Sequence, residues 1–198
     1  MVYWNAIDGN LSIKETQKKA MNKIWALLVI SLLFSPMAGC TSDDEDETVV
    51  FPIFSAVADN DEVYDNSRMD GNPFIVIFSA EWCNNPCYTS MHSIWETIPE
   101  TTVLVMSTDP AENASGITLS EWHDSADAFD DDDDDNTGVS LTSYAFMKGH
   151  EPGEKLGITA PGTVMFVNSV GEVTKTHVGI LDDSTEIQKF WDEASGIA

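Results

Sequence analysis

The sequence predicts an α/β domain whose central β-sheet is covered on both faces. Three observations support this fold class: short runs of β-prone apolar residues, segments with apolar residues at helical spacing, and turn signals between them. The chain has 198 residues, of which 42% are hydrophobic and 22% are charged. A chain of this length and composition suits one globular domain with appendages.

Four strands are predicted. Phe74–Phe78 follows a turn signal and is a continuous apolar run, as expected for a central strand that is buried on both sides. Thr102–Met106 is predicted to be a second buried strand. Thr163–Val167 and Val173–His177 flank a short polar turn and predict a β-hairpin.

Two helices are predicted from the spacing of apolar residues. The first follows the cysteine-containing loop and ends at Pro99, and the second begins near Asp183. Their apolar stripes are Met91, Ile94, Trp95 and Ile98 in the first helix, and Ile187, Phe190, Trp191 and Ala194 in the second. We interpret both stripes as faces that pack on the core. The middle of the chain is therefore predicted to run from strand to cysteine loop to helix.

The charge balance excludes two classes of partner. The chain has 34 Asp and Glu residues against 9 Lys and Arg residues, which gives a formal net charge of −25. Proteins that bind nucleic acids need cations to neutralise phosphates, and anionic membrane surfaces attract basic segments for the same reason. We therefore expect no nucleic-acid partner and no electrostatic attachment to a membrane.

The N-terminal region predicts export and a lipid anchor. Residues 21–39 have a positive start, a short apolar core and small residues directly before Cys40, which resembles a lipoprotein signal peptide. We expect Cys40 to be lipidated on the outer face of the cytoplasmic membrane. A plain secretory signal and an uncleaved anchor are the alternatives, and both also export the rest of the chain. Residues 1–20 are interpreted as a mis-assigned start or, alternatively, a cytoplasmic extension.

Two acidic segments are predicted to stay in solvent. Residues 40–48 cannot bury apolar surface and are expected to form a tether, so the domain itself spans residues 49–198. Asp130–Asp135 is a run of six like charges and is expected to be a flexible loop, with loose binding of a divalent cation as the alternative.

The cysteine loop carries the residues that thiol chemistry requires. A thiolate is the species that attacks a disulfide, and a helix N-terminus stabilises it through unpaired N–H groups and the helix dipole. Cys83 lies at that terminus and is the expected nucleophile, and Cys87 in the first turn is the expected resolving thiol. Pro86 suits a first turn because it lacks an N–H group. Trp82 is expected to cover one flank of the sulfur pair.

The segment Phe78–Cys87 resembles the active-site segment of thioredoxin, and Gly157–Thr163 resembles the loop that carries the cis-proline of that fold. This resemblance implies a thioredoxin-like fold, with a central mixed β-sheet and helices on both faces. It also implies that Pro161 is cis and that Ala160 lies next to the nucleophile. Together with Trp82 and Pro86, these two residues are then expected to contact the substrate.

The long segment before the proline loop points to a subgroup. Fifty residues lie between Pro110 and Pro161, more than in thioredoxin, which is similar to the membrane-tethered TlpA-like thiol-disulfide oxidoreductases. The resemblance implies an acidic insertion at about 111–155. It further implies that the partners are protein thiols and disulfides and an unidentified membrane electron donor. No cofactor is implied beyond the redox-active disulfide.

Two departures from thioredoxin concern the surroundings of the cysteines. Thioredoxin has a buried aspartate six residues before its first cysteine, and this chain has Ile77 there. Glu81 is close in sequence but is expected to be exposed. The two cysteines are also separated by three residues instead of two. A four-residue step places both on one helical face if Cys83 is itself helical.

The cysteine spacing leaves two other interpretations open. A Cys-x3-Cys pair with a distant histidine resembles the copper-binding Sco-type proteins, and two thiolates with an imidazole suit Cu(I). In this alternative Cys83, Cys87 and His177 hold the metal, although no histidine lies directly before the proline loop. In the other interpretation the two cysteines form a passive disulfide, as exported cysteines often do.

Overall fold

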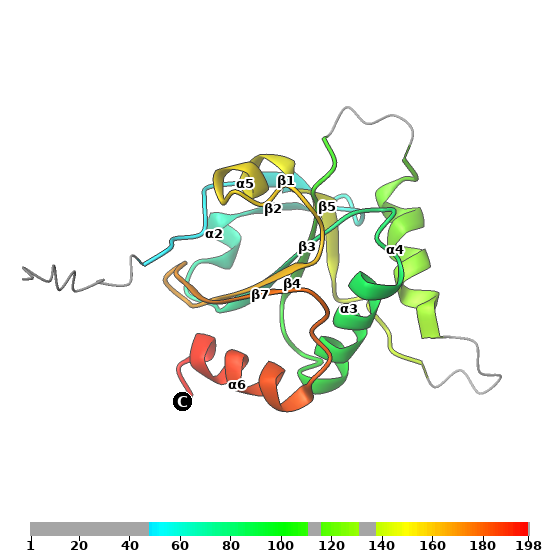
Figure 1. The fold of residues 1–198 in the computed structure, drawn as a ribbon. Helices are drawn as coiled ribbons and strands as arrows, with labels where there is room; N and C mark the ends of the chain where they lie inside the picture. The colour runs from blue at the N-terminus through cyan, green and yellow to red at the C-terminus, as the bar shows by residue number, and fades with distance from the viewer. Residues whose placement is uncertain (1–47, 111–115, 131–137, 198) are drawn as a thin grey trace, which may run out of the picture. The chain divides into compact units, whose positions relative to one another are not determined.

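Strand β3 (Phe74–Ser79) is the centre of a five-stranded mixed sheet with the order β5-β4-β3-β6-β7. In this computed structural model, β3 pairs in parallel with β4 (Val103–Ser107) and antiparallel with β6 (Thr163–Val167) (Figure 1). Strand β5 (Ala145–Lys148) adds in parallel to β4, and β7 (Val173–Val178) adds antiparallel to β6. The predicted central strand and hairpin are confirmed, because the apolar runs are the segments that the sheet buries.

The structure describes residues 48–110, 116–130 and 138–197, and these belong to one compact unit, Glu47–Ala198. Several predictions lie outside the described residues: the signal peptide, lipidation of Cys40, nearly all of the tether, and most of the Asp130–Asp135 run. Within the described part, no helix is both long enough and apolar enough to cross a membrane.

Three helices cover one face of the sheet. They are α3 (Asn85–Thr97), α4 (Leu119–Asp127) and α6 (Ser184–Ser195). Alternate residues of β3, including Ile75 and Ile77, point to this side and share one core cluster with the helices. The helical stripes predicted from the sequence supply this cluster, so their interpretation as core is confirmed.

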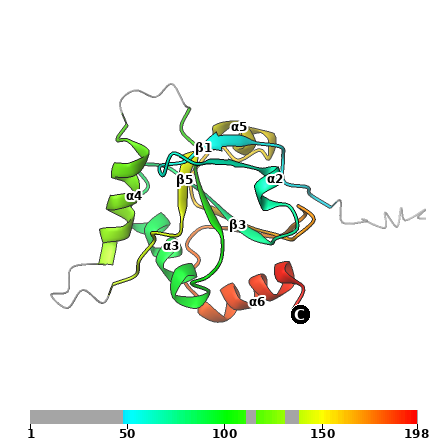
Figure 2. The same ribbon diagram turned by 180° about the vertical axis from the view of Figure 1, so that it is seen from behind.

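The opposite face of the sheet has a second core cluster. Here β3 contributes Phe74, Val76 and Phe78. The face is covered by short elements, which Figure 2 shows from behind: β1 (Ser55–Val57), β2 (Val63–Asp65), α2 (Asn66–Met69) and α5 (His150–Lys155). The sheet is therefore buried on both sides, as the resemblance implied.

Side-chain caps hold the N-termini of α4 and α6. Asp183 caps α6, as predicted, because its side chain accepts hydrogen bonds from the backbone N–H groups of Thr185 and Glu186. Thr118 and Glu121 form a reciprocal capping box at the start of α4. Helix α4, the 3-10 turn Ala128–Asp130, β5 and α5 all lie in the predicted insertion at about 111–155.

A buried ion pair ties edge strand β5 to its neighbours. The Nδ1 atom of His123 on α4 lies 2.6 Å from Oδ2 of Asp59, and its Nε2 atom lies 3.0 Å from the Leu141 carbonyl oxygen. Asp59 Oδ1 also accepts from the N–H of Phe146 on β5 at 2.9 Å, and the His123 ring stacks on the Phe146 ring at 4.4 Å.

Candidate redox-active site

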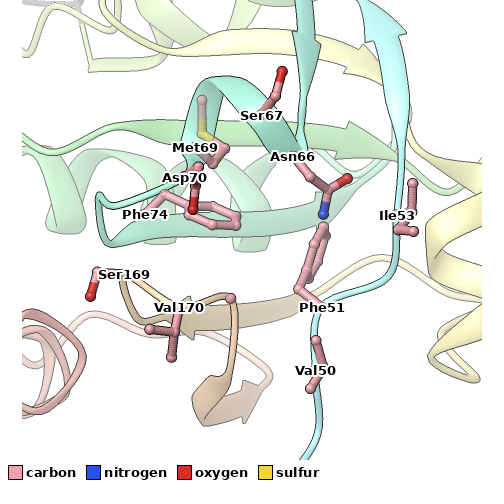
Figure 3. Close-up of a pocket in the computed structure, with 11 residues that line it drawn as sticks. Val50, Phe51, Ile53, Asn66, Ser67, Met69, Asp70, Phe74, Ser169 and Val170 are labelled. Atoms are coloured by element: carbon pink, nitrogen blue, oxygen red, sulfur yellow. The ribbon is translucent and has the colours of Figure 1, made fainter.

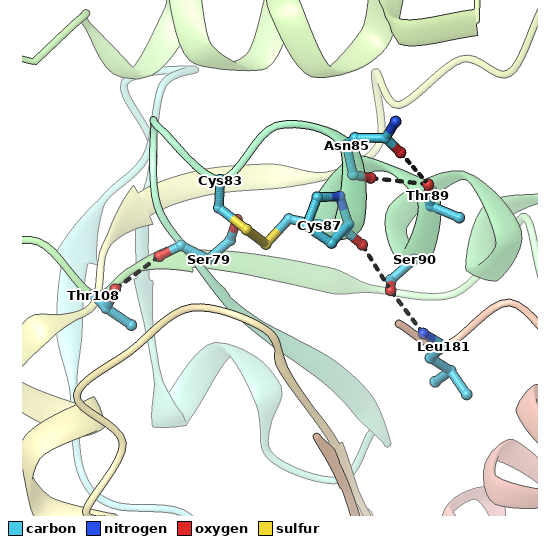
Figure 4. Close-up of a disulfide and its surroundings, with 9 residues drawn as sticks. Ser79, Cys83, Asn85, Cys87, Thr89, Ser90, Thr108 and Leu181 are labelled. Carbon is cyan, nitrogen blue, oxygen red and sulfur yellow. Dashed lines mark hydrogen bonds between the residues drawn. A yellow bond between two sulfur atoms is a disulfide. The ribbon is translucent and has the colours of Figure 1, made fainter. Parts of the chain in front are cut away.

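The two cysteines of the loop after β3 form a disulfide. Cys83 and Cys87 have Cα atoms 5.8 Å apart, and the pair lies where the loop enters α3 (Figure 4). Cys83 is 8% exposed and Cys87 is 2% exposed, so the first sulfur is the more accessible one. Cys83 is not helical: it precedes the N-cap residue Asn84, and its N–H donates to the Ala80 carbonyl at 2.9 Å. The pair therefore bridges a turn and the first turn of α3.

The first turn of α3 is held by several hydrogen bonds. Pro86 lies in this turn, as predicted, where its missing N–H costs no hydrogen bond. The Thr89 hydroxyl donates to the Asn85 carbonyl at 2.8 Å. Ser90 Oγ donates to the Pro86 carbonyl at 3.3 Å and accepts from the Leu181 N–H at 2.9 Å. This last contact ties the cysteine helix to the segment before α6.

Trp82 stands in solvent beside the disulfide. Trp82 is 64% exposed, and its Nε1–H donates a hydrogen bond to Oδ1 of Asp109 at 3.3 Å. Asp109 follows β4, so the hydrogen bond connects the cysteine loop to the next strand along the sheet. This exposed ring provides apolar contact area next to the cysteine pair.

Glu81 is buried, and the prediction that it is exposed is wrong. Only 6% of its side chain is exposed, and it forms an ion pair with Lys148 of β5. Its Oε2 atom also accepts from the Ser107 hydroxyl at 2.9 Å. Lys148 lies 67 residues away in the chain, within the insertion, so local sequence gave no sign of this partner.

The surroundings shift the two carboxyl groups in opposite directions. Burial raises the pKa of Glu81, but hydrogen bonds from Lys148, its own backbone and Ser107 together bring that pKa below its usual value. Partial burial and the nearby Glu81 carboxyl raise the pKa of Asp109. Glu81 therefore holds the negative charge of this cluster, and Asp109 takes up a proton first as the pH falls.

The proline loop precedes β6 as expected, but the Ala160–Pro161 peptide bond is trans, so the expectation of a cis-proline is wrong. The chain turns at Gly162 instead. The φ angle of Gly162 is +101°, which favours glycine, and its N–H donates to the Phe78 carbonyl at 2.8 Å. A groove of about 480 Å³ runs along this loop, with Ala160, Pro161 and Val178 among its lining residues, and none of its lining residues is charged.

Comparisons with known proteins agree with this arrangement. No family model matches the sequence, and no curated protein matches it. Solved structures do match. BsSco, a member of the Sco family of cytochrome c oxidase assembly proteins, is 14% identical over 77% of this chain and 96% of its own, with a TM-score of 0.57. The exposed lipoprotein thioredoxin of Streptococcus pneumoniae is 19% identical over 72% of this chain and 99% of its own, with a TM-score of 0.54.

A third match is MTB DsbF, solved in mixed oxidised and reduced forms. It is 15% identical over 72% of this chain and 95% of its own, with a TM-score of 0.52. The sheet order, the cysteine pair at the start of α3 and these matches agree. The chain has a thioredoxin-like fold.

Within this thioredoxin-like domain, His177 lies apart from the cysteines. It is on β7, where it pairs with Val164 of β6, and its Nε2–H donates to the Ile180 carbonyl at 3.1 Å. Among the described residues, no group of three His, Cys, Asp or Glu side chains is placed to hold a metal ion. The donor set of the copper alternative, Cys83, Cys87 and His177, is therefore not assembled with the disulfide closed.

Another pocket of the thioredoxin-like domain lies away from the cysteines. It has a volume of about 340 Å³ and is lined by residues that include Phe51, Phe74 and Val170 (Figure 3). Phe74 begins β3, whereas the cysteine loop follows the last residue of that strand. The pocket is thus at the opposite end of the central strand and does not belong to the redox-active site.

Sequence reasoning missed three polar residues at the site. These are Ser107, which ends β4, Asp109, which follows it, and Lys148, which ends β5. Parallel pairing with β3 and β5 brings the polar groups at this end of β4 together. Nothing in the sequence identified Lys148, because β5 is a short strand inside the insertion.

Proposed function

We propose that this protein is an extracytoplasmic, membrane-tethered thiol-disulfide oxidoreductase that acts on protein cysteines. The observation that carries this proposal is the disulfide between Cys83 and Cys87 at the N-terminus of α3, beside the exposed Trp82. Both cysteines are buried, but Cys83 is the more exposed residue of the two, which suits a nucleophile followed by a resolving thiol.

The proposed reaction is dithiol-disulfide exchange. In the reducing direction, the Cys83 thiolate attacks a substrate disulfide, and one substrate sulfur leaves as a thiolate. Cys87 then loses its proton and attacks Cys83 in the mixed disulfide, which releases the second substrate sulfur. Two electrons pass to the substrate, and the protein returns to the disulfide form. The N–H groups of the first turn of α3 and the helix dipole stabilise the Cys83 thiolate.

Substrate contacts are proposed on both sides of the disulfide. Trp82 and Pro86 lie on the cysteine loop and helix, and Ala160 and Pro161 lie on the loop before β6. The uncharged groove along that loop is not part of this proposed surface, because its strand residue Met165 belongs to the core cluster on the face of the sheet opposite the cysteines.

The remaining parts of the proposal concern location. We propose that residues 21–39 are a lipoprotein signal, that Cys40 is lipidated and that residues 40–48 tether the domain, as in the TlpA-like proteins that the sequence resembles. A membrane electron donor then restores the dithiol form.

The test is turnover and trapping with the full-length protein. Reduction of insulin disulfides in the presence of dithiothreitol is expected for the wild type and is expected to be lost in Cys83→Ser. Cys87→Ser is expected to accumulate a mixed disulfide with protein substrates, because the resolving thiol is gone. A wild type that gives no turnover and a Cys87→Ser variant that traps nothing would reduce the pair to a passive disulfide.

A second candidate function is copper binding of the Sco type. Two observations favour it: the Cys-x3-Cys spacing and the match to a Sco-family structure. Copper could bind only after reduction of the disulfide, and His177 would have to move toward the sulfurs. Metal analysis of the reduced protein decides this point. One Cu(I) per chain, lost in Cys83→Ser and in His177→Ala, together with absent insulin turnover, would replace the first proposal.

A further inference from the structure

Ser79 is the last residue of β3 and is fully buried. Its backbone carbonyl accepts two hydrogen bonds, from the Thr108 N–H at 2.8 Å and from the Thr108 hydroxyl at 3.2 Å. Its side-chain hydroxyl has no hydrogen-bond partner within the described part of the chain. Buried hydroxyls are nearly always paired, so this one calls for a physical reason.

The position of Ser79 suggests the reason. Residues of β3 alternate between the two faces of the sheet, and Ile75 and Ile77 belong to the core cluster that also contains Cys83 and Cys87. Ser79 is the next residue on that face, so its side chain points to the side of the disulfide. Figure 4 draws Ser79 beneath the cysteine loop, with its hydroxyl toward the Cys83 end of the bond.

The two redox states offer this hydroxyl different partners. A sulfur in a disulfide carries no charge and is a weak acceptor, whereas a thiolate is an anion that accepts strong, charge-assisted hydrogen bonds. In the oxidised protein the hydroxyl remains unpaired, which disfavours that state. After reduction the hydroxyl can donate to the sulfur that carries the charge, which favours the reduced state.

We propose that Ser79 is a positioning residue that donates a hydrogen bond to the thiolate of the reduced Cys83–Cys87 pair and thereby makes the disulfide more oxidising. This inference rests on the proposed thiol-disulfide function and adds a residue that tunes its direction. A disulfide whose reduced form is stabilised accepts electrons more readily. Removal of the hydroxyl therefore shifts the equilibrium toward the disulfide.

The experiment is a redox titration of the full-length protein with glutathione. In this reaction the protein disulfide and two molecules of glutathione give the protein dithiol and one glutathione disulfide. For Ser79→Ala the equilibrium constant for reduction is expected to fall about tenfold, which corresponds to a potential about 30 mV more negative.

Ser90→Ala is the matched control. Ser90 is also a buried serine near the pair, but its hydroxyl already has two partners in the oxidised protein, the Pro86 carbonyl and the Leu181 N–H. Its removal is expected to destabilise the oxidised and reduced forms equally. The equilibrium constant with glutathione therefore stays within about twofold of the wild type.

Urea unfolding of both redox forms gives a second readout that separates a redox role from a packing role. Oxidised Ser79→Ala is expected to be at least as stable as the oxidised wild type, because it loses an unpaired polar group. Reduced Ser79→Ala is expected to be less stable than the reduced wild type.

Two results would overturn the inference: an unchanged equilibrium constant in Ser79→Ala, or an oxidised variant that is less stable than the wild type or fails to fold. A wild-type protein that does not exchange with glutathione at all would instead refute the proposed function, so the two failures are distinguishable.

Discussion

Two ion pairs contact edge strand β5 or its neighbours, and they differ in how much of their side chains is exposed to solvent. The Asp59–His123 pair connects β5 to α4, and every polar atom of both side chains has a partner. In the Glu81–Lys148 pair the carboxylate is equally well buried, but 30% of the lysine side chain is exposed. Ser107 links Glu81 to Asp109, because its hydroxyl donates to Glu81 and accepts from the Asp109 N–H at 3.2 Å. Asp109 in turn accepts a hydrogen bond from the exposed Trp82 beside the disulfide.

From this difference in exposure we expect the Asp59–His123 pair to affect mainly stability and the Glu81–Lys148 pair to affect mainly redox behaviour. Breaking a closed network leaves an unpaired charge in the core, so the cost appears in folding. Breaking a network that opens to solvent costs less, because the freed lysine reaches water. Its effect appears instead in the chemistry of the neighbouring cysteines. The same contrast predicts which substitutions change stability and which change redox behaviour.

The largest effect is expected for Asp59→Ala. It removes the acceptor of both the His123 ring and the Phe146 N–H, so two polar groups of the interior each lose a hydrogen bond. We expect a loss of about 3–5 kcal/mol in the free energy of unfolding, measured by urea denaturation. Asp124→Ala, an exposed neighbour on α4, is the control and is expected to change stability by less than about 0.5 kcal/mol.

Insulin turnover per folded molecule is expected to be unchanged in Asp59→Ala. A loss of turnover without a loss of stability would show that this pair also serves the cysteines, and the contrast with Glu81 would fail.

For Glu81→Gln we expect a smaller loss of stability than for Asp59→Ala, together with a change in the equilibrium constant with glutathione. Lys148 can turn to solvent, so the loss in unfolding free energy is about 1–2 kcal/mol. The lost negative charge no longer repels the thiolate, so the equilibrium constant with glutathione is expected to rise, opposite in sign to Ser79→Ala. Glu62→Gln breaks the exposed pair with Arg68 and is the control, with no redox change expected.

The pH dependence of stability sharpens the assignment of charge to Glu81. Because its pKa in the folded protein lies below the usual 4.5, its contribution to stability is present above that value and is lost as the pH falls through the folded pKa. The difference in unfolding free energy between the wild type and Glu81→Gln is therefore expected to shrink on acidification. A difference that stays constant from pH 6 down to pH 2 would contradict the assignment.

The pKa of Asp109 is shifted in the opposite direction, so its contribution to stability has the opposite pH dependence. Its raised pKa means that the folded state binds the proton more tightly, so its favourable contribution is present at low pH and is lost as the pH rises through the folded pKa. Urea unfolding of Asp109→Asn over the same pH range is expected to show a benefit of the substitution that appears above the usual value of 3.8.

The smallest stability effect is expected for Trp82→Phe. The ring is mostly in solvent, and its one hydrogen bond, to Asp109, spans 3.3 Å. The free energy of unfolding is expected to change by less than about 0.5 kcal/mol. Insulin turnover is expected to show a raised KM with kcat retained. A loss of kcat would mean that Trp82 fixes the cysteine loop rather than contacting the substrate.

The sequence predicted the elements that carry strong local signals. Strands β3 and β6 are continuous apolar runs, a polar turn separates β6 from β7, and the apolar stripe of α6 begins shortly after Asp183. Strand β5 was not predicted, because four residues inside an acidic insertion give no periodic pattern. Its place beside β4 results from long-range packing. The capping box formed by Thr118 and Glu121 was a local signal that could have located α4.

In the candidate site, too, the features with a local sequence signal were predicted and those set by long-range packing were not. Cys83, Cys87 and Pro86 were predicted because they are adjacent in the chain and their roles follow from a helix N-terminus. The burial of Glu81 was not predicted, because its cation comes from a strand 67 residues away. The trans bond before Pro161 was also missed, because local sequence does not set this isomer and the turn is made at Gly162.

Backbone hydrogen bonds join the first described residues to the end of the sheet opposite the disulfide. The Val173 N–H donates to the Val49 carbonyl, and the Phe51 N–H donates to the Gly171 carbonyl, both at 2.8 Å. The Gly171 turn lies next to the start of β3, and the disulfide follows the end of that strand. The chain therefore enters the domain at the end of the sheet opposite the disulfide, which leaves the sulfur end free of the entering segment.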